Sequence, residues 1–156
     1  MRGLGSQNID HRLRHQEFAP TEGIRWLGMT IAALSKLQSV LVVGSNLRKD
    51  HPLFAQRIRQ AARHGCAVSA ITSEAWLKTE GAWAMPLSAH MLAEPGEWVQ
   101  RLADVAAAMA EQKGVSAPAA GTSTDAAKAI GQALLSGEQK EILLGIAAAH
   151  HPKASS

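Results

Sequence analysis

The residues best suited to chemistry are Gly44, Ser45 and Asn46, which follow an apolar run at residues 40–43 and precede a helical pattern. A glycine turn between a strand and a helix can bind phosphate, because free backbone N–H groups and the helix dipole both favour an anion. The turn has one glycine, however, and lacks the G-x-G-x-x-G and Walker lysine patterns. Asp50 would also repel a phosphate. A cofactor contact and a tight turn that only closes an α/β unit therefore both stay open.

The other reactive side chains suggest no catalytic or metal-binding arrangement. His51 and His151 each precede a proline, where packing or capping is the expected role. Cys66 opens an apolar stretch, so we expect a small buried hydrophobic residue rather than a nucleophile. A single cysteine also excludes an internal disulfide and any site built on several thiolates. We predict no catalytic residue, no metal ligand and no cofactor beyond the glycine turn.

Composition places the chain among globular domains. It has 156 residues, of which 46% are hydrophobic and 19% charged, and its net charge of +3 is too weak to indicate nucleic-acid binding. The apolar runs are shorter than a bilayer span, and the polar N-terminal segment does not have the pattern of a signal peptide. One cysteine suits a reducing compartment. We therefore expect a cytoplasmic protein that is not inserted in the membrane.

Hydrophobic spacing predicts the elements that position the turn. A continuous apolar run ending in glycine is typical of a strand buried on both faces, which favours a parallel sheet. Asp50 is a candidate N-cap for the helix that follows. The predicted helices are at residues 24–37, 52–64, 95–113 and 125–135, and the predicted strands are at residues 40–43, 66–71, 82–87 and 141–145. Together they predict an α/β, Rossmann-like layered domain with a mostly parallel sheet flanked by helices.

One unit occurs twice along the chain. A buried strand, a glycine, a short loop and a His-Pro pair that opens a helix occur at residues 40–52, and the same order returns at residues 142–152. The first copy continues into its helix and next strand, whereas the second stops soon after the His-Pro pair. We therefore expect an irregular arm at residues 1–23, an α/β domain at residues 24–137, and the start of a second, truncated unit at residues 138–156.

Three segments carry a resemblance to a known family. Residues 5–12 read GSQNIDHR, residues 40–65 read VLVVGSNLRKDHPLFAQRIRQAARHG, and residues 143–155 begin the second unit. They resemble the large iron–sulfur subunit of bacterial NADH:quinone oxidoreductase (respiratory complex I). A related turn occurs in molybdopterin oxidoreductases such as formate dehydrogenases, although residues 48–50 are more charged here. The chain thus resembles an internal piece of the molybdopterin-oxidoreductase-like region of that large subunit.

The resemblance implies a non-catalytic structural domain that supports electron transfer from NADH to quinone in the assembled complex. The isolated chain would be inactive and hold no cofactor, with the iron–sulfur clusters elsewhere in the large subunit. Its partners would be the rest of that subunit and other peripheral-arm subunits, on the cytoplasmic face of the inner membrane, and we expect an apolar surface patch where they sit. The alternative is a module that binds a nucleotide- or molybdopterin-type cofactor through Gly44, Ser45 and Asn46.

Overall fold

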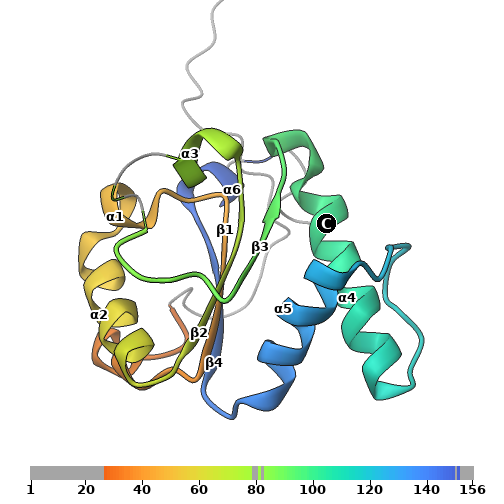
Figure 1. Ribbon diagram of the computed structural model, residues 1–156, viewed down its shortest axis with the longest axis horizontal. Coiled ribbons are helices and arrows are strands. Elements are labelled where there is room, and N and C mark those ends of the chain that lie inside the picture. Colours follow the sequence, from red (N-terminus) through yellow and green to blue (C-terminus); the bar gives the residue numbers. More distant parts are fainter. Residues whose placement is uncertain (1–26, 79–80, 82, 150, 152–156) are drawn as a thin grey trace, which may run out of the picture.

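A computed structural model describes residues 27–78, 81, 83–149 and 151 of the chain, and its centre is a four-stranded sheet (Figure 1). All neighbouring strands are parallel, in the order β3-β2-β1-β4. The strands are β1 (Ser39–Val43), β2 (Ala67–Thr72), β3 (Ala89–Leu92) and β4 (Lys140–Leu144). Helices lie on both faces of this sheet, so the predicted α/β layered fold is confirmed.

The helical elements alternate with these strands along the chain. They are η2 (Ile31–Lys36), α1 (Leu47–Asp50), α2 (Pro52–Arg63), α3 (Glu74–Lys78), η3 (Pro95–Glu97), α4 (Trp98–Lys113), α5 (Asp125–Ser136) and α6 (Ile146–Ala149), where η marks a 3₁₀ helix. The arm predicted at residues 1–23 lies outside the described residues.

The first core lies between the sheet and α2, on the left in Figure 1. Strand β1 is buried along its whole length, and Val40 and Val42 point toward Ile58 of α2 in this cluster. Pro52 suits the first turn of α2, where its missing N–H has no partner to lose. Gly65, with φ of 94°, then reverses the chain toward β2. Burying each large side chain here contributes about 1.5–3 kcal/mol.

The second core lies on the opposite face, under α4 and α5. Alternate β1 residues, Leu41 and Val43, point into it. The N-terminus of α5 is fixed by Thr124, whose hydroxyl accepts a hydrogen bond from the Ala127 N–H at 3.2 Å. Gly114, with φ of 66°, ends α4, and an exposed loop follows.

Two predicted elements are wrong in position or type. The third strand is β3 at Ala89–Leu92, not at residues 82–87, where residues 83–85 form bends and residues 86–87 are irregular. Pro86 has no N–H to give to a ladder, and pairing begins only after the Ser88 N–H reaches Val68 O at 2.7 Å. The helix predicted at residues 24–37 is the short 3₁₀ helix η2, preceded by Thr30; residues 24–26 lie outside the described part.

Candidate functional site

The glycine turn lies at the place in the sheet where connections change direction. The chain leaves β1 through α2 to reach β2 on one side, and later returns through α4 and α5 to reach β4 on the other side. In open parallel sheets, ligands bind at such a switch point, outside the carboxyl ends of the strands. Gly44, Ser45 and Asn46 follow β1 directly, and Gly145 follows β4 beside them. The structure therefore places the three predicted site residues, which are consecutive in the sequence, at the topologically favoured position.

Three donors of this turn, the Ser45 hydroxyl and the N–H groups of Gly44 and Asn46, are already engaged within the chain. One carboxylate oxygen of Asp50, Oδ2, accepts a hydrogen bond from Ser45 Oγ at 2.8 Å and another from the Asn46 N–H at 3.0 Å. The Gly44 N–H donates to Ile71 O at 3.0 Å in the sheet. Asp50 thus occupies the place where a ligand phosphate would meet these groups.

The prediction that Asp50 caps the following helix is wrong. His51 holds the N-cap position of α2, and its side chain makes no capping hydrogen bond. Instead Asp50 ends the four-residue helix α1, in a segment predicted to be a turn, and its carboxylate folds back toward Ser45. A four-residue helix has too small a dipole to bind an anion, and Pro52 removes one N–H from the start of α2.

The two glycine turns pack directly against each other. Gly44 has φ of 59°, and a Cβ atom there would lie 2.7 Å from Trp98 Cζ3 and 2.9 Å from Ala148 Cβ. A Cβ on Gly145 would overlap Ser45 Cβ and the carbonyl oxygen of Gly44. The repeat seen in the sequence is therefore also a contact in space, since β1 and β4 are paired in parallel. In both copies a helical turn, α1 or α6, follows the glycine.

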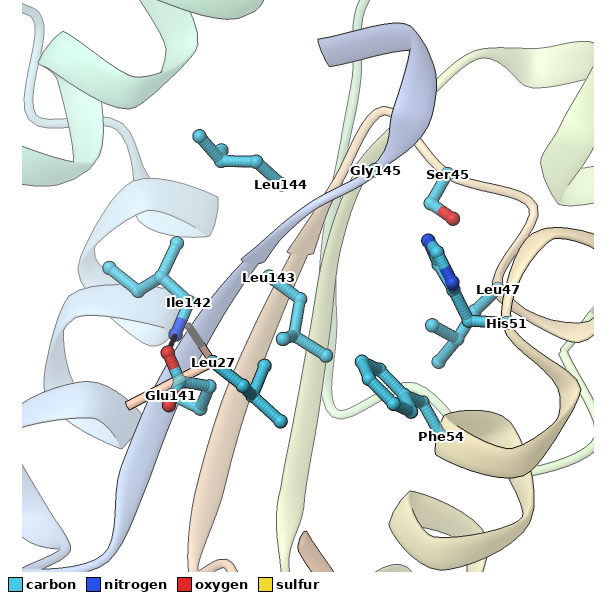
Figure 2. Close-up of a pocket in the computed structure, with 10 residues that line it drawn as sticks. All are labelled: Leu27, Ser45, Leu47, His51, Phe54, Glu141, Ile142, Leu143, Leu144 and Gly145. Carbon is cyan, nitrogen blue, oxygen red and sulfur yellow. Dashed lines mark hydrogen bonds between the residues drawn. The ribbon is translucent and has the colours of Figure 1, made fainter. Parts of the chain in front are cut away.

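A cavity of about 410 Å³ opens beside this turn, between β4 and α2 (Figure 2). Leu143, from β4, points into it on the same side as Leu47 and Phe54. The His51 ring stacks on Phe54 with ring centroids 5.3 Å apart, which agrees with the packing role expected for this histidine. The lining is mainly apolar, with few polar groups, as is usual for sites that bind small organic molecules.

Most of this cavity was not predicted from the sequence. Phe54 and Leu143 belong to a predicted helix face and a predicted strand, and nothing in their spacing indicates that they share a pocket. One signal was present, because the repeat places two similar turns in one sheet and neighbouring parallel strands end at the same edge. Leu27 also lines the cavity, in a segment where the predicted helix did not form.

Cys66 lies away from this site, at the start of β2. It is 7% exposed and belongs to the first core, as predicted for a small buried hydrophobic residue. Burial raises the pKa of its thiol to about 11. Among the described residues, no group of three His, Cys, Asp or Glu side chains is arranged to hold a metal ion.

No protein-family model matches the chain, and no curated protein matches it. In the part of the sequence that the structure describes, every helix is too short or too polar to cross a bilayer. Functional conclusions therefore depend on the sequence resemblance and on the geometry of the glycine turn.

Proposed function

We propose that the chain is a non-catalytic structural domain of the large iron–sulfur subunit of bacterial NADH:quinone oxidoreductase. In this proposal it supports electron transfer from NADH to quinone by packing beside cluster-bearing domains, and it carries no cofactor itself. Its partners are the rest of the large subunit and other peripheral-arm subunits, at the cytoplasmic face of the inner membrane. Activity belongs to the assembled complex.

The observation that carries this proposal is the position of the Asp50 carboxylate. It accepts hydrogen bonds from Ser45 Oγ and the Asn46 N–H, the groups that would have to meet an anionic cofactor. A phosphate placed there would displace a bonded carboxylate and then lie beside its charge, which costs free energy twice. A turn whose Ser45 hydroxyl and Asn46 N–H are already bonded to Asp50 suits a domain whose role is to pack.

The proposal is tested on the natural gene product. Host membranes and cytosol are separated under native conditions, and peptides of this sequence are followed by mass spectrometry. We expect them to migrate with a much larger polypeptide that contains clustered cysteines and with NADH dehydrogenase activity. Peptides that migrate as a free protein near 16.5 kDa would contradict the proposal.

The cavity beside the turn favours a second candidate, a module that binds a nucleotide- or molybdopterin-type cofactor. Its volume of about 410 Å³ would hold one ring system, with the polar side chains of Ser45, His51 and Glu141 at its wall. A ligand that binds only the folded state raises the melting temperature by mass action. A rise with GDP, GMP or a free pterin that disappears in Phe54→Asp would favour this candidate. Equal melting temperatures with and without these ligands would rule this candidate out.

A further inference from the structure

One face of β4 lacks the covering that the rest of the sheet has. Ile142 and Leu144 pair with Leu41 and Val43 of β1, so they point to the same side as α4 and α5. Leu41 and Val43 are fully buried, whereas Ile142 and Leu144 are each 48% exposed. The difference arises because α5 makes its main contacts with β1 and β3, and reaches the cavity beside Ile142 only through Leu134 and Leu135 near its end.

Two cavities open along this face of β4, and we call them together the β4 groove. The first, of about 470 Å³, lies between Leu144 and the first half of α4, including Val99 and Leu102. The second, of about 440 Å³, lies between Ile142 and the last turns of α4 and α5, at Met109 and Leu134. Figure 2 shows Ile142 and Leu144 directed away from Leu143, toward the side of β4 where α5 lies. The groove thus follows α4, whose 16 residues span about 24 Å.

The shape of the groove fits an α-helix. Its floor is a single strand, and its wall is α4 with the end of α5 beside the second cavity. Helices are what cover the faces of parallel sheets. The crossover from β1 to β2 places α2 on the opposite face. If a further parallel strand lay beside β4 on its open side, a right-handed crossover from β4 would place the connecting helix on the face of Ile142 and Leu144. A helix in this place would run antiparallel to β4, as crossover helices do.

Charge at one end of the groove fixes the direction of this helix. Lys113 and Lys140 both line the second cavity, at the end where β4 begins. Glu141 also lines this cavity, but it pairs with Val40 and so lies on the opposite face of β4 from Lys140. Neither ammonium group has an ion-pair partner among the described residues. The last turn of a helix carries unsatisfied carbonyl groups with partial negative charge, which cations stabilise. A helix that ends at these lysines therefore has complementary charge as well as an apolar face.

We propose that the β4 groove binds an amphipathic α-helix of about four turns from a neighbouring domain. Its apolar stripe packs on Ile142, Leu144 and the flank of α4, and its carboxyl end lies at Lys113 and Lys140. The identity of the partner as a segment of the large iron–sulfur subunit rests on the function proposed above, but the groove itself does not. The binding test uses the chain alone, so it can fail or succeed independently of co-migration with a complex.

The probe is a display library of peptides of about 18 residues, with varied apolar residues at i, i+3, i+4 and i+7 and a helical polar face. Peptides selected on the full chain are synthesised, and their affinities are measured by calorimetry. We expect Leu144→Asp to weaken binding by about tenfold or more, because it places a charge in the floor of the groove. The double variant Lys113→Gln, Lys140→Gln should lower the affinity for peptides with a free C-terminal carboxylate by a few fold. The affinity for peptides with an amidated C-terminus should fall less.

The matched control is Leu92→Asp on β3, at the other edge of the sheet, where Leu92 is 46% exposed against 48% for Leu144. Circular dichroism and melting confirm that each variant folds, and we expect Leu92→Asp to leave peptide affinity unchanged. Selected peptides that bind Leu144→Asp as tightly as the parent chain would overturn the proposal, as would a library that yields no binder. Self-association of the chain that Leu144→Asp abolishes would assign the face to a second copy instead.

Discussion

Asp104 is a buried carboxylate that holds a loop against a helix. It lies in α4 with 2% of its surface exposed, and its Oδ1 accepts hydrogen bonds from the Thr122 N–H at 2.8 Å and Gln100 Nε2 at 3.2 Å. Arg101 Nη1 donates to Oδ2 at 3.2 Å. Burial by itself would raise the pKa of Asp104, but these hydrogen bonds and the charge of Arg101 outweigh it and hold the pKa below 3.8.

We predict that Asp104→Asn destabilises the fold by about 1–3 kcal/mol at pH 7, because an amide would face the same donors without a charge. Since the folded pKa is the lower one, the stabilisation by Asp104 is complete above pH 3.8 and is lost as pH falls through the folded pKa. The difference in the free energy of unfolding between parent and variant, measured by urea unfolding, should therefore become smaller in acid. The exposed Asp125→Asn is the control, and a gap that stays constant from about pH 6 to about pH 2.5 would contradict the argument.

At the scale of elements, the turn after β1 depends on close packing between two strand ends. Gly44 lies against Trp98 of α4 and Ala148 of α6, both distant in the sequence, while Gly145 lies against Ser45. A side chain at either glycine would have to move a neighbouring element. The turn therefore fixes how α4 and α6 sit at the carboxyl edge of the sheet.

Gly44→Val should destabilise the protein by about 2–4 kcal/mol, because a branched side chain there would need both a positive φ and space now filled by the Trp98 ring. Thermal melting followed by circular dichroism measures the change. Gly96→Val is the matched control, since a Cβ at Gly96 meets no atom within 4 Å. A Gly44→Val variant that melts with the parent chain would show that the turn can relax.

Some elements could be predicted from the sequence because their local signals agree with their tertiary environment. The β1–α2–β2 unit has an uninterrupted apolar run, a proline at the start of its helix and a glycine at its end. Strand β3 has four residues and no clear alternation, whereas the apolar residues before it imitate a strand. The carboxylate of Asp50 shows why the site could not be fully predicted from the sequence. An aspartate at this position suits both a helix N-cap and a hydrogen bond back to Ser45. Only the packing of α1 decides between them.

At the scale of the whole molecule, the sheet separates two cores, and the single cysteine lies in one of them. Cys66 packs in the core beneath α2, which also contains β1 and Leu143 of β4. Exposing its sulfur therefore requires separation of several elements. The reactivity of the Cys66 thiol therefore measures opening of the core between α2 and the sheet rather than motion of one loop.

We predict that iodoacetamide at about pH 8 modifies Cys66 at least about a hundredfold more slowly in the folded chain than in urea, because burial restricts access and raises the thiol pKa from 9.0 to about 11. The rate should rise with urea along the circular dichroism transition. Ser116→Cys in a Cys66→Ala background is the exposed control and should react rapidly throughout. Fast labelling of Cys66 in buffer would show that this core opens locally. Because the folded pKa is the higher one, stability from this thiol falls as pH rises from 9.0 to about 11.

The pairing of β1 with β4 has a consequence for synthesis of the chain. Gln38, just before β1, accepts hydrogen bonds through Oε1 from the N–H groups of Glu138 and Gln139, about one hundred positions later. Ribosomes add roughly 5–20 residues per second, so one side of β1 waits several seconds for its neighbour. During that interval Val40 to Val43 can pair with β2 but have an open edge toward the position of β4. The order of translation thus makes β1, an inner strand of the finished sheet, an edge strand of the nascent one.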